Sequence, residues 1–379
     1  MSLPTFSPVE HAAWGVRLPV LSRQAHVAVI GAGAFGAWTA LFLRKKGLRV
    51  TLLDGNGVGN HLASSGDESR ILRASYGSNK LYFELCMRAK ELWLAYEQAW
   101  KTPLFIPGGV LWLCPEQRIS LLDDAMPLYQ ARDLACEYLS IHELGVRYPM
   151  INTEGLHHGV LDPSAGYLMA QSSIRHVVEE FVKMGGSFSQ HFAKPGYAGN
   201  RIQHLELSDG SKLNADAYLF ATGPWLGKQF PQILGDRLTC SQQEVFYFDI
   251  PKGHGIEHLP AWLDADGKVF FYGIPGSPGG FKIGVDRRGP VLDPDLQERK
   301  GSAALLEEIR RYMAFRFPAL AHARLHHHRI CPYENSSDGN FIAEGHPEQS
   351  NVVFLGGGSG HGFKHGPALG EWMANQMTD

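Results

Sequence analysis

The chain has 379 residues, more than one ordinary hydrophobic core accommodates, so we expect two domains. Hydrophobic residues make up 44% and charged residues 19% of the sequence, which is the composition of a globular protein. The formal net charge of −3 and the lack of a Lys/Arg run argue against a nucleic-acid partner, and no apolar run approaches the ~20 residues that a membrane-spanning helix needs.

The cysteines are odd in number and widely spaced, and none forms a Cys-x-x-Cys pair: they are Cys86, Cys114, Cys136, Cys240 and Cys331. This pattern indicates neither a zinc site nor a disulfide framework, and it favours a reducing, cytoplasmic setting. Residues 1–24 contain prolines and scattered polar residues without a signal-peptide pattern, and we expect them to form an arm on the surface. No segment is an obvious interaction helix, so we expect a monomer or a small homo-oligomer.

Residues 27–36 read Val-Ala-Val-Ile-Gly-Ala-Gly-Ala-Phe-Gly, an apolar run that leads into Gly-x-Gly-x-x-Gly. Gly31 allows a tight turn, Gly33 lets the backbone approach a pyrophosphate, and Gly36 lets the following helix pack close to the strand. A second strand-like run ends at Asp54, whose carboxylate can accept hydrogen bonds from ribose hydroxyls. Strand, helix, strand and acid together predict a dinucleotide site, without separating NAD from FAD.

Small polar residues follow at positions 63–69, and two arginines, Arg70 and Arg73, come next. Small residues suit close approach to a ligand, and two arginines three apart would share one face if this stretch were helical. A solvated loop with surface arginines explains the same residues equally well.

The middle of the chain alternates helical and strand-like patterns. Helices are predicted at residues 80–100, at 119–131, in the region up to 149, at 172–184 and at 305–315. Strands are predicted at 105–113, 187–191, 202–207 and 217–220, and an antiparallel aromatic sheet at 240–285. The block from about 80 to 150 reads as an insertion, and one face of the aromatic sheet is expected to line a substrate pocket.

Three patterns are ambiguous on local evidence. Gly223, at the end of a strand, either brings bare backbone close to a cofactor or forms an ordinary turn. Lys282 lies mid-strand between apolar residues, where a charge is costly unless it is paired or used, although strand alternation can also point it into solvent. Three consecutive histidines at 326–328 also lie in an expected strand, and without a neighbouring ligand pattern we expect no metal there.

Near the C-terminus a strand runs into a glycine-rich stretch at 356–362 and then into a helix at 367–377. This second strand–glycine–helix unit has no Gly-x-Gly-x-x-Gly with a terminal acid, so we expect no second nucleotide. The N-terminus of this helix can stabilise negative charge on the N1 edge of a reduced flavin.

Residues 331–342 read Cys-Pro-Tyr-Glu-Asn-Ser-Ser-Asp-Gly-Asn-Phe-Ile, which is similar to a family segment Cys-x-Tyr-x-x-Thr/Ser-x-Asp-x-x-Phe-Ile. With the dinucleotide motif, this makes the chain from about residue 27 onward resemble the monomeric sarcosine oxidase family of FAD-dependent amine oxidases, within the D-amino acid oxidase-like group. The resemblance implies FAD linked through its 8α-methyl group to the thiol of Cys331. On local evidence alone, a lone cysteine is an inert buried thiol.

The same resemblance implies the catalytic and substrate-binding residues. Lys282 resembles the lysine over the flavin that promotes oxygen reduction, since an ammonium stabilises superoxide, and we place Tyr272 and Arg70 with it in the catalytic set. Arg73 and Lys364 resemble the pair that binds a substrate carboxylate while the Cα–H faces the flavin. His361 and Asp286 complete the predicted substrate-binding set. The predicted cofactor-binding residues are Gly31, Gly33, Phe35, Gly36, Asp54, Ser65, Arg70, Gly223, Trp225, Cys331, Gly358, Gly360, Gly362 and Lys364.

Two positions depart from the family pattern. The family segment before the first arginine usually reads Ser-His-Gly-Asp-Thr-Arg or Ser-Gly-Gly-x-Ser-Arg, whereas residues 65–70 read Ser-Gly-Asp-Glu-Ser-Arg. Four residues after the lysine, sarcosine oxidases carry histidine, and this chain has Asp286. That acid either contacts the substrate amine or a larger polar group, or it is a turn residue. Both departures leave the reaction class unchanged but put sarcosine itself in doubt.

The resemblance implies an α/β fold with a Rossmann-type FAD-binding domain and an antiparallel-sheet substrate-binding domain. We expect the FAD-binding domain to comprise residues 1–79, 150–225 and 320–379, with 1–24 as the arm. The substrate-binding domain is expected to comprise residues 80–149 and 226–319.

We expect an FAD-dependent oxidase of a small secondary-amine α-amino acid, N-methylated or cyclic, that yields an imine and hydrogen peroxide. Its partners would be this small-molecule substrate and O2, with no nucleic acid and no membrane. One alternative is a dehydrogenase that passes electrons to an acceptor other than O2. The other is a non-catalytic flavin-bearing subunit of a larger assembly.

Overall fold

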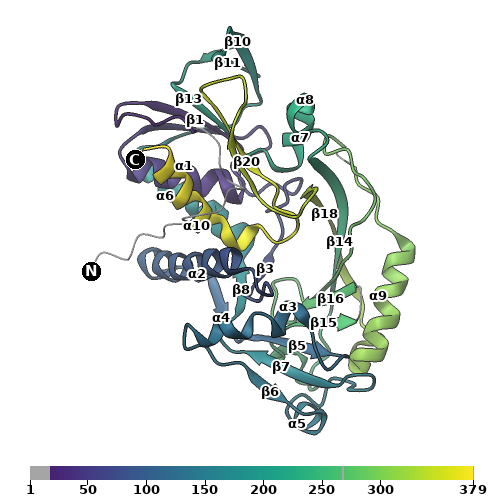
Figure 1. Ribbon diagram of the computed structural model, residues 1–379. Coiled ribbons are helices and arrows are strands. Elements are labelled where there is room, and N and C mark those ends of the chain that lie inside the picture. The colour runs from purple at the N-terminus through teal and green to yellow at the C-terminus, as the bar shows by residue number, and fades with distance from the viewer. Residues whose placement is uncertain (1–17, 267–268, 297, 379) are drawn as a thin grey trace.

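The computed structural model describes residues 18–266, 269–296 and 298–378. Positions 1–17 of the predicted N-terminal arm lie outside these residues. The described chain forms two main sheets, with helices gathered on the first and one long helix, α9 (Ala303–Arg316), on the second (Figure 1). Among the described helices, none is both long and apolar enough to cross a membrane.

In the described part of the chain, six strands form the first sheet in the order β19-β20-β13-β1-β2-β9. The four neighbouring pairs from β20 to β9 are parallel, and β19 runs antiparallel at one edge. The central strands are apolar and buried along their length, as expected for a parallel sheet covered on both faces. The strands are β1 (His26–Ile30), β2 (Arg49–Leu53), β9 (Ser187–Ser189), β13 (Ala217–Phe220), β19 (Ile342–Gly345) and β20 (Val352–Gly356).

Helices from distant parts of the sequence pack against this sheet and each other. They are α1 (Ala34–Lys45), α2 (Lys80–Trp100), α6 (Ala170–Lys183) and α10 (Gly366–Gln376). α1 contacts both α6 and α10, and α10 also contacts α2 (Figure 1). The ring of Trp38 on α1 packs against Trp93 and Tyr96 of α2, with ring centroids 5.1 and 4.9 Å away. Edge-to-face aromatic packing of this kind fixes α2 beside the nucleotide-type unit.

The second sheet has the order β18-β14-β17-β16-β15-β5-β7-β6 among the described residues. Its neighbours are antiparallel apart from the parallel pair β15–β5. Ile309 and Met313 of α9 belong to the same buried cluster as Trp262 and Phe281 of the sheet. The strands are β5 (Val110–Cys114), β6 (Glu137–Leu139), β7 (His158–Asp162), β14 (Leu238–Phe248), β15 (Ala261–Asp266), β16 (Val269–Ile274), β17 (Phe281–Asp286) and β18 (Leu325–Ser336).

Shorter elements complete the fold. One small sheet contains β3 (Ser69–Leu72), β8 (Gly166–Met169) and β4 (Phe105–Pro107). Another contains β10 (Ala193–Ala198), β11 (Arg201–Leu207) and β12 (Lys212–Leu213). The short helices are α3 (Ser120–Asp123), α4 (Met126–Gln130), α5 (Ile141–Arg147), α7 (Leu226–Gln229) and α8 (Pro231–Leu234). Short 3₁₀ turns lie at Gly223–Trp225, Ile256–His258, Pro318–Leu320 and Phe363–His365.

Two local expectations from the sequence differ from the structure. The single helix expected at 119–131 is two short helices, α3 and α4, and Pro127 lies in the first turn of the second. Proline suits a first helical turn and cannot continue a preceding helix, which explains the break. The stretch with Arg70 and Arg73 is not helical, because residues 69–72 form strand β3 and pair with β8. The two arginines therefore belong to different surroundings, as the site shows.

The predicted domain boundaries cut through contacts of the fold. β7 and β18, which those boundaries give to the FAD-binding domain, pair within the eight-stranded sheet. α2, which they give to the substrate-binding domain, packs against α10. We therefore still propose two domains, but we assign β7 and β18 to the substrate-binding domain and α2 to the FAD-binding domain.

Candidate cofactor and active site

The turn from β1 into α1 depends on two glycines. Gly31 has φ +104°, and a Cβ there would lie 2.3 Å from the carbonyl oxygen of Ala221. A Cβ on Gly36 would lie 1.9 Å from the carbonyl oxygen of Gly31. No side chain caps the N-terminus of α1, so its first backbone N–H groups remain available at the turn. Free N–H groups at a helix N-terminus form an anion site suited to a pyrophosphate.

Asp54 lies directly after β2, beside this turn. One of its carboxylate oxygens accepts a hydrogen bond from the Ala32 N–H (2.9 Å), and the other accepts one from the Asn56 N–H (3.0 Å). Burial raises the pKa of Asp54, and these backbone donors oppose that rise. The carboxylate is thus held at the end of the strand, where a ribose would lie if a dinucleotide crossed the turn.

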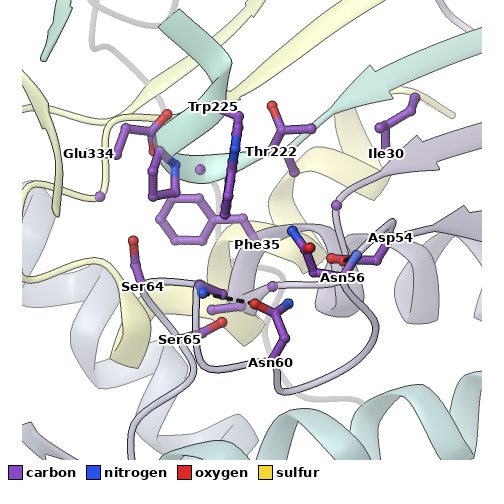
Figure 2. Close-up of a pocket in the computed structure, with 18 of the residues that line it drawn as sticks. Ile30, Phe35, Asp54, Asn56, Asn60, Ser64, Ser65, Thr222, Trp225 and Glu334 are labelled. Carbon is purple, nitrogen blue, oxygen red and sulfur yellow. Dashed lines mark hydrogen bonds between the residues drawn. The ribbon is translucent and has the colours of Figure 1, made fainter. Parts of the chain in front are cut away.

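A cavity opens at the carboxyl ends of β1, β2, β13 and β20. Figure 2 shows Asp54 and Asn56 at one end of it and Glu334 at the other, with Phe35 and Trp225 between them. The predicted cofactor-binding residues line this cavity except for Gly36, Cys331 and Lys364. Ligands of open α/β sheets bind in this position, outside the carboxyl ends of the strands.

Glu334 of β18 was not foreseen from the sequence. Its Oε2 accepts a hydrogen bond from the Gly357 N–H (2.9 Å), and its buried Oε1 has no hydrogen-bond partner among the described residues. Burial raises the pKa of Glu334 to about 8, so the acid is largely neutral at pH 7. A neutral carboxylic acid at this end of the cavity adds a polar group without adding charge.

Lys282 on β17 is 1% exposed and lies at the centre of a buried ionic cluster. Its Nζ donates to Oδ2 of Asp67 (2.5 Å) and to the carbonyl oxygen of Ser69 (2.6 Å). Arg70 forms an ion pair with the same Oδ2 and donates to the Ser64 carbonyl oxygen (2.6 Å). Tyr247 of β14 donates its hydroxyl to Oδ1 of Asp67 (2.5 Å). The mid-strand lysine is therefore paired and does not point into solvent.

Asp67 was not predicted as a site residue, although it joins two that were. Burial alone would raise its pKa, but Lys282 and Arg70 hold the pKa of this carboxyl well below its usual value. The Asp67 carboxyl is therefore ionised at neutral pH. In the sequence, the only available signal was the departure from the family segment at this position.

Cys331 and Tyr272 lie beside this cluster. Cys331, 3% exposed, packs with Val245 and Tyr247, and the partly buried Tyr272 contacts the same group. Burial raises the pKa of the Cys331 thiol, Asp67 raises it further, and the neighbouring cations Arg70 and Lys282 lower it. The thiol thus lies among cations that can stabilise a thiolate.

Arg73 and Lys364 converge on a second place, around the ring of Tyr76. The Arg73 guanidinium carbon lies 5.4 Å from the ring centroids of both Tyr76 and Trp112, and Lys364 Nζ lies 5.0 Å from the Tyr76 centroid. Arg73 donates to the backbone and hydroxyl oxygens of Ser75, and Lys364 donates to the His361 carbonyl oxygen (3.2 Å). Among the described residues, none of these contacts is a carboxylate. Burial, and then Arg73, lower the pKa of Lys364 to about 7.

His361 and His365 hold Tyr76 in place. His361 Nε2 lies 3.1 Å from the Gly339 carbonyl oxygen, which can only accept, so this nitrogen is the donor. The Nδ1 of His361 then accepts from the Tyr76 hydroxyl (3.1 Å), and His365 Nε2 donates to the same hydroxyl (2.8 Å). Burial, and then Lys364, lower the pKa of His361 to about 3, which keeps the ring neutral.

Asp286 ends β17 and belongs to the surroundings of the two cations. Its side chain is accessible but enclosed by protein on several sides. This enclosure raises the pKa of Asp286, whereas Arg73 and Lys364 lower it. Two basic groups and one acidic group therefore lie close together, which matches the two ends of an α-amino acid.

The structure thus distributes the predicted site residues over three places: the cavity, the Lys282–Asp67 cluster and the group of cations around Tyr76. Gly36 lies behind the turn, where it sets the distance between helix and strand. Besides Asp67 and Glu334, sequence reasoning missed Tyr76, Tyr247 and His365. Aromatic and histidine side chains carry no spacing signal that separates a site from a core.

The cavity fits FAD by the chemistry of its lining: free helix N-terminal donors, a terminal acid and glycine-walled space at the strand ends. The family model described as FAD dependent oxidoreductase matches residues 26–376. Monomeric sarcosine oxidase of Bacillus sp. (strain B-0618) is 27% identical over 368 residues, which cover 93% of this chain and 92% of that protein. N-methyl-L-tryptophan oxidase of Salmonella enteritidis PT4 (strain P125109) is 26% identical over 371 residues, covering 92% of this chain and 93% of that protein.

Among solved structures, L-proline dehydrogenase from P. horikoshii is similar with a TM-score of 0.79 at 18% identity, covering 94% of this chain and 93% of that one. The likeness confirms the predicted α/β fold class. The chain belongs to the FAD-dependent oxidoreductase family. It is an oxidoreductase that acts on CH–NH bonds with FAD, and the predicted enzyme class is confirmed.

Proposed function

We propose that the protein oxidises a small α-amino acid bearing a secondary amine, N-methylated or cyclic, to the corresponding imine. The observation that carries this proposal is a pair of cations, the half-buried Arg73 and the buried Lys364, for which no ion pair to a described carboxylate is formed. Buried charges are costly unless they are paired, so this arrangement suits a ligand that brings its own carboxylate. The curated relatives support the amine class, since their names give sarcosine and N-methyl-L-tryptophan as what they oxidise.

In this proposal, Arg73 and Lys364 hold the substrate carboxylate and Asp286 lies near the substrate amine. Tyr76, fixed by His361 and His365, forms the aromatic wall beneath both cations. Bound FAD would supply the redox chemistry, as the acceptor of a hydride equivalent from the substrate Cα–H bond and the source of the two electrons that reduce O2 to hydrogen peroxide. Lys282 contributes the positive charge that stabilises the charge developing on O2. A neutral His361 next to Lys364 adds no further charge to the carboxylate site.

We further propose that Cys331 carries the FAD covalently, in a reducing, cytoplasmic setting that matches its five free thiols. Acid precipitation of the purified protein is then expected to give a yellow pellet and an intact mass increased by one FAD. In Cys331→Ala the pellet should be colourless, with FAD in the supernatant. The matched control is Cys240→Ala, a half-buried thiol away from the Lys282–Asp67 cluster, which should keep the yellow pellet. A colourless wild-type pellet with free FAD would refute the link.

A peroxide-coupled screen of N-methyl and cyclic amino acids tests the reaction itself. Turnover with hydrogen peroxide supports the oxidase, whereas anaerobic bleaching followed by slow reoxidation in air would identify the dehydrogenase alternative. A flavin that no substrate bleaches would leave the non-catalytic subunit as the better description. Absence of flavin even after reconstitution with FAD would contradict the whole assignment.

The pKa of Lys364 makes substrate binding depend on pH. A carboxylate ligand binds better to the protonated amine, so affinity is full below pH 7 and falls as pH rises through the pKa of about 7. Propionate, which has a carboxylate and no amine, should bind roughly tenfold more weakly for each pH unit between 7 and 9. The measurement is the flavin absorbance change on titration with propionate. Lys364→Met should bind weakly at every pH, and a steep pH dependence that survives this change would contradict the assignment.

A further inference from the structure

Asp67 is the carboxylate on which the buried ionic cluster depends. Its side chain is fully buried, and it accepts from Tyr247 through Oδ1 and from Lys282 and Arg70 through Oδ2. Arg329 lies 3.9 Å from Oδ1. One acid is therefore shared by three cations.

The chain places this acid where the family segment has none. Both forms of that segment carry glycine at the third position, and here that position is Asp67. The residue comes from the loop before β3, whereas Lys282 comes from β17, 215 positions later. The ion pair therefore joins the loop beneath the cavity to the aromatic sheet.

Lys282 would be difficult to keep charged without this partner. Burial lowers the pKa of Lys282, and Asp67 opposes that effect. Arginine keeps its proton in proteins, so lysine is the member of this cluster that gives up its charge when the acid is removed. The charged and titratable groups around the pair, from every element packed against it, are Arg70 of β3, Tyr247 of β14, Tyr272 of β16, and His327, Arg329, Cys331 and Tyr333 of β18.

We propose that Asp67 is a positioning residue that fixes the ammonium of Lys282 and keeps it cationic, and so extends into alkaline pH the range in which O2 is reduced at this site. This inference rests on the proposed function. In the step concerned, O2 takes two electrons and two protons from reduced FAD and the solvent, which leaves oxidised FAD and hydrogen peroxide. Negative charge develops on O2 as it accepts the first electron, and a fixed ammonium stabilises that charge.

The same contacts fix both the position and the charge of the Lys282 ammonium. Two of the three N–H groups of Lys282 are used, one by the Asp67 carboxylate and one by the Ser69 carbonyl oxygen. The third forms no hydrogen bond to a described residue. Tyr247 and Arg70 restrain the carboxylate in turn, so the ammonium is held by groups from two sheets and has little freedom to move.

The test uses holoenzyme reduced anaerobically with one equivalent of dithionite, so that it does not depend on the identity of the substrate. Reduced protein is mixed with aerated buffer in a stopped-flow instrument between pH 6 and pH 9. In wild type the reoxidation rate should change by less than threefold over this range. In Asp67→Asn it should fall at least tenfold from pH 6 to pH 9, as Lys282 loses its proton. If Asp67→Asn does not accumulate, Asp67→Gly carries the same prediction, because it also removes the carboxylate that pairs with Lys282.

Two variants control this experiment. Tyr247→Phe removes a hydrogen bond to the same carboxylate without changing charge, so its profile should stay as flat as that of wild type. Lys282→Met should be slow at every pH. Wild-type reoxidation rates in Lys282→Met would refute the role of Lys282 in the proposed function, which is a different failure from a flat Asp67→Asn profile.

Sulfite binding supplies a readout that is not turnover. Sulfite adds to oxidised flavin and leaves negative charge on the ring, so a nearby cation tightens its binding. The sulfite Kd of Asp67→Asn, divided by that of wild type at the same pH, should rise at least tenfold between pH 6 and pH 9. The ratio cancels the titration of sulfite itself. A constant ratio, or faster reoxidation of Asp67→Asn at every pH, would overturn the proposal, because Asp67 would then only mask the charge of Lys282.

Discussion

Arg73→Met is expected to lower kcat/KM for amino-acid substrates by roughly 1,000-fold, about 4 kcal/mol of transition-state binding. The arginine is held by the Ser75 oxygens and by the faces of Tyr76 and Trp112, so its guanidinium is oriented before a substrate arrives. Methionine fills much of the same space between the two rings but cannot bind a carboxylate. The fall in kcat/KM would therefore come from the loss of a preorganised ionic contact and not from a change in packing between the two rings.

Steady-state kinetics with a pair of substrates separates these effects. An N-methyl amino acid should lose the full factor, whereas the corresponding amine without a carboxylate, a poor substrate of wild type, should change by less than threefold. The matched control is Arg287→Met, an exposed arginine paired with Glu308 of α9, which should leave kcat/KM within twofold. An equal loss for both substrates in Arg73→Met would show that the variant disturbs the flavin side and not carboxylate binding.

The parts of the site that could be predicted from sequence are those fixed by local backbone geometry. The β1–α1–β2 unit is specified within 28 residues, because a positive φ at Gly31 and the close contact at Gly36 allow no other residue. Asp54 follows directly after the second strand for the same reason. The helix at 80–100 was likewise predictable, since its apolar spacing continues without a break between two polar ends.

The rest of the site depends on contacts between distant segments. Asp67 lies in a run of small polar residues that reads as a solvated loop, and only its distance from Lys282 in space reveals the ion pair. The sequence left two possibilities for Lys282, a paired lysine or a solvated one. Which of them holds depends on whether an acidic side chain lies close to the middle of β17. Arg70 and Arg73 would have shared one face if their stretch were helical. It forms strand β3 instead, and the two arginines lie in two different clusters. Such outcomes follow from how the two sheets meet, which no local pattern records.

Gly36→Ala is expected to abolish FAD binding and to lower the yield of folded protein strongly. The added Cβ would lie 1.9 Å from the Gly31 carbonyl oxygen, which is backbone and cannot rotate away. To accommodate a methyl group, α1 must move off the sheet, which breaks its packing against β1 and α10. Overpacking of a buried contact of this kind costs about 3 kcal/mol or more, a large part of the stability of a typical domain. Soluble yield, flavin content and urea unfolding measure the effect.

Two other glycines make this prediction specific. Gly33→Ala meets only the Ser65 hydroxyl at 3.4 Å, so the protein should fold, with a weakened affinity for FAD because the methyl group enters the space for the pyrophosphate. Gly145→Ala, in the interior of α5 with nothing within 4 Å, should leave FAD binding unchanged and raise stability by about 0.5–1 kcal/mol. If Gly36→Ala retained full flavin content and wild-type stability, the close contact of helix and turn would not be what holds the dinucleotide site together.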